Sequence, residues 1–246
     1  MIAALLLGLV VGLLLALTGA GGGILGVPLL VFVLHRSVAA SAPIALLAVG
    51  LAAAVGAGLG LRDGIVRYRA AALIGGIAMA VAPLGVMAAQ RIPNAPLTIA
   101  FALVLAFSAW RMWRRSRQCA HLQDERAALP CLIDARDGRL VWTRPCAQAL
   151  ALTGVIAGTL SGLLGVGGGF VIVPALTRFT ELSARSVVAT SLAVMALASV
   201  GGVGAAALHG VIDWTIALPF AAGAVLASLP ARLIAARVAG PRLQQG

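Results

Sequence analysis

Long apolar runs, separated by short segments that carry the charges, set the pattern of this 246-residue sequence. A helix needs about 20 predominantly apolar residues to cross the hydrocarbon core of a bilayer. Most runs reach that length with few or no charges, which predicts an all-α polytopic membrane protein with about 7 membrane segments. The segment 114–145 is instead polar and carries eleven Arg, Asp and Glu residues. The apolar runs cover residues 1–34, 38–61, 70–89, 97–113, 146–179, 187–208 and 214–236.

The chain contains an internal repeat with an offset of 146 residues. The segment GAGGGILGVP, from Gly19 to Pro28, recurs as GVGGGFVIVP from Gly165 to Pro174. Self-similarity of this kind indicates two copies of one structural unit. The second copy is shorter and lacks a counterpart of the last helix of the first. The predicted units are a first membrane repeat at 1–113, a linker at 114–145 and a second membrane repeat at 146–246.

Each repeat begins with an apolar run that glycines interrupt, and the arginines indicate how these runs enter the membrane. If both broken runs cross, the repeats are parallel and the arginines divide 11 to 7 between the two sides. If each broken run returns to its own side as a re-entrant hairpin, the second repeat is inverted. The division then becomes 16 to 2, with only Arg36 and Arg91 outside. Because cytoplasmic loops carry the excess of basic residues, we predict two inverted repeats in a cell (inner) membrane, with the linker and the C-terminus in the cytoplasm.

The glycine clusters have a chemistry of their own. Non-helical backbone persists in a membrane only where protein buries it or where it lines a wet cavity. Glycine lets the backbone approach a ligand closely, and the helix that starts after each cluster turns its free N–H groups and positive dipole end towards the loop. Such an arrangement binds anions without a basic side chain. Two copies that enter from opposite faces meet near the midplane, as in secondary transporters. Tight helix packing is the alternative role for these glycines.

Residues next to the glycine clusters complete the predicted substrate site. A proline follows the last glycine of each cluster by five residues and disturbs the short helix there. Hydroxyl groups on the following helix add donors, unless they are bonded to the local backbone. The predicted substrate-binding residues are Thr18, Gly19, Gly21, Gly22, Gly23, Pro28, Ser41, Gly165, Gly167, Gly168, Gly169, Pro174, Thr190 and Ser191.

Composition supports the membrane class. Hydrophobic residues make up 61% of the chain and charged residues only 10%, which excludes a water-soluble globule. The net charge of +11 is typical of nucleic-acid binding in a soluble domain. Here the arginines lie between apolar runs, so membrane topology and anionic lipid explain them instead. None of the seven acidic residues lies within an apolar run, so no embedded carboxylate is available for a cation site or a proton relay.

The three cysteines are Cys119, Cys131 and Cys146, and they form no CxxC pair. We interpret them as free thiols on the reducing side of the membrane, and we expect no metal site.

The repeated GxGGGxxxxP motif, the segment VVATSL from Val187 to Leu192, and Gly210 at the start of the next loop resemble the sulfite exporter TauE/SafE family of membrane permeases. The likeness extends over nearly the whole chain except the linker. Members of this family move sulfite, sulfonates, thiosulfate and related small anions, mostly outward. They usually carry eight spans, so the resemblance implies that this chain is about one helix short.

Taken together, the sequence predicts a secondary transporter that exports a small anion such as sulfite, a sulfonate or a related organosulfur or carboxylate anion. An anion channel on the same scaffold is the first alternative, and an intramembrane enzyme or assembly subunit is the second. We expect no enzyme activity, no catalytic residue, no cofactor and no metal, because the sequence offers no paired carboxylates, metal cluster or activated nucleophile. The expected partners are the small anionic substrate and the lipid bilayer, with a homo-oligomer as an open alternative to a monomer and no nucleic acid.

Overall fold

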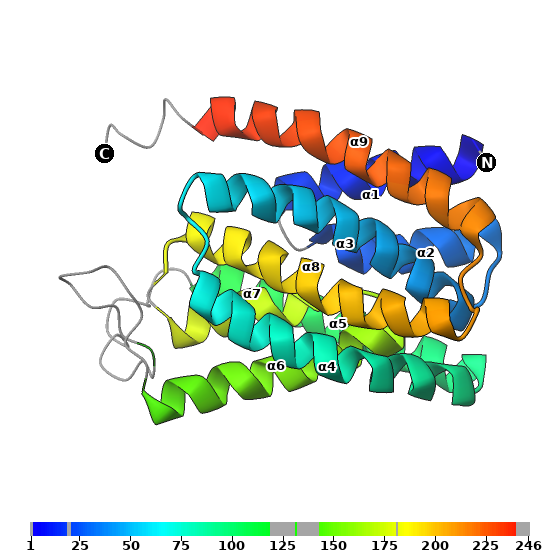
Figure 1. Ribbon diagram of the computed structural model, residues 1–246, viewed down its shortest axis with the longest axis horizontal. Helices are drawn as coiled ribbons and strands as arrows, with labels where there is room; N and C mark the ends of the chain where they lie inside the picture. The colour runs from blue at the N-terminus through cyan, green and yellow to red at the C-terminus, as the bar shows by residue number, and fades with distance from the viewer. Residues whose placement is uncertain (1, 19–20, 119–130, 132–142, 181, 240–246) are drawn as a thin grey trace.

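The computed structural model describes residues 2–18, 21–118, 131, 143–180 and 182–239. In these ranges the chain forms nine α-helices and no β-sheet (Figure 1), which confirms the all-α prediction. Four of the helices, α3, α4, α6 and α8, are long and apolar enough to cross a membrane. This is consistent with a polytopic membrane protein, and the number of seven segments stays a prediction. The helices are α1 (Ile2–Thr18), α2 (Gly21–Leu34), α3 (Val38–Arg62), α4 (Tyr68–Arg91), α5 (Asn94–Gln118), α6 (Arg144–Leu164), α7 (Gly169–Phe179), α8 (Ala184–Leu208) and α9 (Trp214–Ala239).

Hydroxyl caps define where the long helices begin. Ser37 Oγ accepts a hydrogen bond from the Ala40 amide at the start of α3, and Ser183 Oγ accepts one from the Ser186 amide at the start of α8. Such caps satisfy an amide that the first helical turn leaves without a partner. The two caps are 146 residues apart, so α3 and α8 begin and end at matching positions of the two halves.

Helices α3 and α8 form the centre of the bundle, and the other helices pack around them. Helix α3 contacts α8 and α9, whereas α8 contacts α3 and α4. Helix α1 packs along α9, and α6 packs along α4 (Figure 1). Small residues allow this close approach: a methyl group on Gly50 of α3 would overlap Ser199 of α8.

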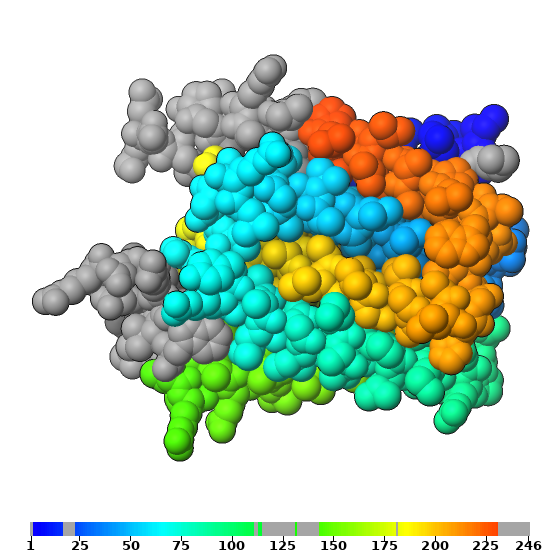
Figure 2. Space-filling view, in the orientation of Figure 1, coloured from blue at the N-terminus to red at the C-terminus, as the bar shows by residue number. Residues whose placement is uncertain are grey.

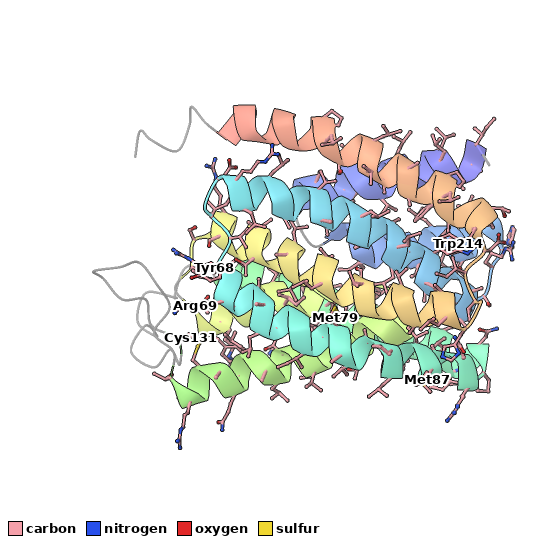
Figure 3. The ribbon with its side chains drawn as sticks, viewed as in Figure 1. Tyr68, Arg69, Met79, Met87, Cys131 and Trp214 are labelled. Atoms are coloured by element: carbon pink, nitrogen blue, oxygen red, sulfur yellow. A yellow bond between two sulfur atoms is a disulfide. The ribbon has the colours of Figure 1, made fainter. Side chains whose placement is uncertain are left out.

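Contacts at the two ends of the bundle connect the halves of the chain. At one end, Arg36 forms an ion pair of 2.8 Å with Asp213, which directly precedes Trp214. At the other end, Ser186 Oγ donates to the Ile65 carbonyl at 2.7 Å. Figure 3 places Tyr68 and Trp214 at opposite ends, which we call the Tyr68 end and the Trp214 end. Helix α3 therefore runs from the Trp214 end to the Tyr68 end, and α8 runs the opposite way.

Helices α6 and α7 form a hairpin, and both helices are bonded at its open end to Cys131 of the linker. Cys131 and Cys146 form a disulfide with a Cα–Cα distance of 5.0 Å, and the Cys131 amide donates to the Phe179 carbonyl at 3.2 Å. The start of α6 and the end of α7 thus lie together, at the Tyr68 end (Figure 3). The interpretation of Cys131 and Cys146 as free thiols is therefore wrong, because Cys131 lies against the first turn of α6 and is bonded to Cys146 there. Cys119 and most of the linker lie outside the described residues.

Candidate functional site

The two glycine clusters lie where the helical structure is interrupted. Helix α6 ends at Leu164 and α7 begins at Gly169, so the second cluster forms a connection of four residues. In the first half, α1 ends at Thr18 and α2 begins at Gly21, and the intervening residues, Gly19 included, lie outside the described ranges. Gly21, Gly22 and Gly23 therefore belong to the first turn of α2 rather than to the break.

The backbone of the second cluster explains its glycines. Gly165, Gly167 and Gly168 have φ values of 70°, 72° and 71°, in the left-handed region that side chains with a Cβ avoid. Gly165 ends α6 through a hydrogen bond of 2.8 Å from its amide to the Ser161 carbonyl. Gly168 is the N-cap of α7 and supplies no side-chain cap. The sequence thus folds into a tight turn that opens directly into a helix N-terminus.

Four consecutive amides in this turn have no hydrogen-bond acceptor among the described residues. They belong to Val166, Gly167, Gly168 and Gly169, and all four residues are buried. Buried amides without a partner are rare in proteins, since each forfeits its hydrogen bond to water. Successive amides at left-handed turns and helix N-termini form concave sites for anions. The turn is therefore a buried cluster of donors.

The turn lies halfway along the two central helices. A methyl group on Gly167 would lie 3.0 Å from Val49 Cγ1 of α3 and 3.1 Å from Met195 Cε of α8. Val49 and Met195 are each the twelfth residue of a 25-residue helix, and they are 146 residues apart. A methyl group on Gly23 would overlap the Val166 carbonyl. The structure therefore brings Gly23 of the first cluster against the second cluster at the middle of the bundle.

Two buried hydroxyl groups flank the turn without hydrogen-bond partners among the described residues. Ser161 lies one helical turn before Gly165, and its side chain is 0% exposed. Gly165 in turn contacts the backbone of Ala42, whose neighbour Ser41 is also 0% exposed. Ser41 was among the predicted site residues. Ser161 was not, although its position one turn before the glycine cluster could have indicated it.

The remaining predicted residues are less closely grouped. Thr190 Oγ1 accepts a hydrogen bond from the Arg67 amide, and Ser191 Oγ donates to the Val188 carbonyl, so both hydroxyls are engaged with backbone. Pro28 and Pro174 lie half-buried inside α2 and α7. The side chain of Thr18 is outside the described set.

Charged groups lie at the helix ends. The acids that the structure describes are Asp63 and Asp213, both at turns between helices. The Thr215 hydroxyl donates to the Asp213 carboxylate, and together with Arg36 it holds the pKa of Asp213 below its usual 3.8. Within the described ranges, no group of three metal-ligating side chains comes together. The middle of the described bundle thus presents donors and no carboxylate.

Comparisons with known proteins agree with this geometry. A "Probable membrane transporter protein" of Xylella fastidiosa (strain 9a5c) is 29% identical over 234 residues, which cover 92% of this chain and 82% of that protein. A protein of the same name from Xylella fastidiosa (strain Temecula1) is 28% identical over 239 residues, covering 94% and 84%. A third, from Methanocaldococcus jannaschii, is 28% identical and covers 80% of this chain and 69% of its own. No solved structure matches the chain.

These relatives are named as transporters, a class of proteins that are generally not enzymes. The model of the family "Sulfite exporter TauE/SafE" matches residues 4–246, nearly the whole sequence. Together with the apolar helices that can span a membrane, this match leads to one conclusion: the chain belongs to the sulfite exporter TauE/SafE family of membrane transporters.

Proposed function

We propose that this protein is a secondary transporter that exports a small oxyanion or organosulfonate, and that the anion binds to the amides of Val166–Gly169. The observation that carries the proposal is the row of four buried amides without acceptors, halfway along α3 and α8. An unsatisfied buried donor destabilises a protein by about 1–3 kcal/mol. An anion in the turn would accept from several of these donors at once and offset that destabilisation.

The chemistry of the surroundings favours a negatively charged ligand. The positive end of α7 points into the turn, and no described carboxylate lies near it to repel an anion. The unpaired hydroxyls of Ser161 and Ser41 add two donors next to Gly165 and Ala42. Sulfite and sulfonates present three oxygens, which is the kind of acceptor that a cluster of amides and hydroxyls accommodates.

We further infer that the two halves are inverted repeats. At the offset of 146 residues, α1 corresponds to α6, α3 to α8 and α4 to α9, whereas α5 has no counterpart. Exchanging each helix for its counterpart turns the packing of α1 on α9 into that of α6 on α4, and the packing of α3 on α9 into that of α8 on α4. The ion pair between Arg36 and Asp213 supports the inversion, because in the parallel arrangement these residues would lie on opposite sides of the membrane. The opposite directions of α3 and α8 in Figure 1 support it too.

This arrangement suits alternating access. In transporters with inverted repeats, one half rocks against the other around a fixed central site. The Tyr68 end, which carries most of the arginines, is then the cytoplasmic end. In this arrangement the contact between Gly23 and Val166 brings both halves to the anion, and the buried turn corresponds to a closed state.

Transport by proteoliposomes tests the proposal. Purified protein is reconstituted, and uptake of labelled sulfite and of methanesulfonate is measured with and without unlabelled anion inside. A Cys131→Ser/Cys146→Ser background is used because sulfite cleaves disulfides. Saturable uptake that internal anion accelerates is the expected result, whereas flux that follows voltage without counterflow identifies the channel instead. If folded protein moves no small anion, the proposed function is wrong.

The variant Gly168→Val probes the turn. A Cβ there is strained by the positive φ and would lie 3.1 Å from the Ala157 carbonyl. The matched control is Gly204→Val in α8, where a methyl group meets open space. We expect Gly168→Val to abolish uptake and the control to retain it, with membrane insertion measured for both. An unchanged rate in Gly168→Val would mean that the turn has no part in transport.

A further inference from the structure

An open apolar groove of about 340 Å³ lies between α3, α4 and α8 near the Tyr68 end. Its lining includes Ala57 and Gly58 of α3, Tyr68 of α4 and Leu197 of α8, and every other lining residue is aliphatic. The volume falls within the roughly 300–1,000 Å³ of pockets that hold small ligands. Figure 2 shows α8 between α3 and α4 on this face of the bundle. The three helices are long and apolar enough to span a membrane, so the groove opens towards hydrocarbon.

Basic residues adjoin Tyr68, which lines the groove. The Arg69 guanidinium carbon is 5.9 Å from the centre of the Tyr68 ring, which itself lines the groove (Figure 3). Arg67 precedes Tyr68, and its Nε is buried without a hydrogen-bond partner, the one such side-chain nitrogen in the described part of the chain. Arg62 is exposed in the same turn, and Asp63 is the only acid there. Of the described residues, none forms an ion pair with Arg62, Arg67 or Arg69.

An apolar groove with unpaired arginines next to it matches the chemistry of one membrane component. A soluble anion would gain nothing from the aliphatic lining, and a zwitterionic lipid would bring its own headgroup cation next to the arginines, where like charges repel. We propose that the groove binds an anionic phospholipid, with one acyl chain between α3, α4 and α8 and the phosphate accepting hydrogen bonds from Arg67 and Arg69. Basic pockets between membrane helices at the headgroup level recognise anionic lipids in this way.

The position of the groove gives the lipid a consequence for the protein. Helices α3 and α4 belong to the first half of the chain, whereas α8 belongs to the second. The turn between α3 and α4 is also held to α8 by the bond from the Arg67 amide to Thr190 Oγ1. A bound phospholipid therefore joins the two halves at the Tyr68 end and stabilises their contact there. This inference does not depend on which anion the protein transports.

Lipid binding is tested on the full chain in detergent. Phosphatidylglycerol and phosphatidylcholine with identical acyl chains are added in turn, and bound lipid is counted by native mass spectrometry while thermal unfolding is followed. We expect retention of phosphatidylglycerol and a higher unfolding temperature with it. The variant Arg67→Gln/Arg69→Gln keeps the main-chain bond to Thr190, and its affinity should fall by at least about tenfold. Arg91→Gln, at the opposite end of α4, is the matched control and should bind as the parent does.

A second pair of variants tests the acyl-chain part. At Gly58 in the groove a Cβ would meet open space, so Gly58→Leu fills the groove without a clash. Gly76→Leu in α4 also meets open space but lies outside the lining, which makes it the control. Gly58→Leu should lose the phosphatidylglycerol effect and Gly76→Leu should keep it. Equal retention of both lipids, full binding in Gly58→Leu or in the double arginine variant, or the same stabilisation by inorganic phosphate alone would overturn the proposal.

Discussion

Replacing Ser161 by alanine separates a ligand-binding hydroxyl from a structural one. The Ser161 side chain is fully buried in α6, and its Oγ has no hydrogen-bond partner in the described structure. A buried hydroxyl without a partner destabilises the folded state by about 1–3 kcal/mol. Alanine removes that group, leaves a void no larger than one oxygen atom, and forms helices at least as well as serine. Without substrate, Ser161→Ala should therefore be more stable than the parent.

The expected size follows from the same numbers. A gain of about 1–3 kcal/mol in the free energy of unfolding corresponds to an increase of roughly 2–12 °C in the unfolding temperature of a chain of about this length. With substrate the sign reverses, because the variant lacks one hydrogen bond to the anion. A bond to a charged group contributes about 1.5–3 kcal/mol, so the affinity should fall roughly 10- to 150-fold.

The assay is thermal unfolding in detergent at increasing concentrations of sulfite or methanesulfonate, since ligand that binds only folded protein raises the unfolding temperature by mass action. Ser228→Ala is the control, because Ser228 is equally buried but its Oγ donates to the Val225 carbonyl at 2.8 Å. That variant should show no gain in stability and unchanged affinity. A less stable Ser161→Ala protein, or one with the parent's affinity, would refute the reasoning.

Three further predictions follow from other parts of the bundle. Gly204 of α8 faces open space, so Gly204→Ala should raise the free energy of unfolding by up to about 1 kcal/mol. Gly165→Ala should instead fail to fold stably, because its Cβ would overlap the Ala42 backbone. Denaturation curves of the two variants and the parent measure both effects. Since the folded pKa of Asp213 is lowered from 3.8, its stabilising effect is present above that value and is lost as pH falls through the lowered pKa. Asp213→Asn should therefore flatten the fall in unfolding temperature below about pH 4. Reducing the Cys131–Cys146 disulfide, which joins residues 15 apart in the sequence, should lower the free energy of unfolding by about 3 kcal/mol; equal unfolding temperatures with and without reductant would mean that the bond does not stabilise the α6–α7 hairpin.

Much of the helical framework follows from the sequence because it depends on local patterns. Ser37 and Ser183 signal the starts of α3 and α8, and the apolar runs give the long helices nearly their observed bounds. The start of α2 at Gly21 was less predictable, since glycine fits both a loop and the first turn of a helix.

Features that depend on contacts far apart in the chain could not be predicted. A serine inside a helix usually bonds its own backbone, so only the folded structure reveals that Ser161 lacks a partner. The disulfide between Cys131 and Cys146 depends on the path of a polar linker that has no periodicity to guide a prediction. The groove beside Gly58 is lined by residues of three helices, so the sequence pattern of any one helix cannot predict it.

The fastening of the α6–α7 hairpin makes the two halves mechanically unequal. Cys131 is bonded to Cys146 near the start of α6 through the disulfide and to Phe179 at the end of α7 through its amide. These two bonds hold the open end of the α6–α7 hairpin together. Helices α1 and α2 contain no cysteine, so no disulfide can hold them in the same way. If release of the transported anion requires one pair of helices to move, we expect α1 and α2 to move while α6 and α7 stay in place.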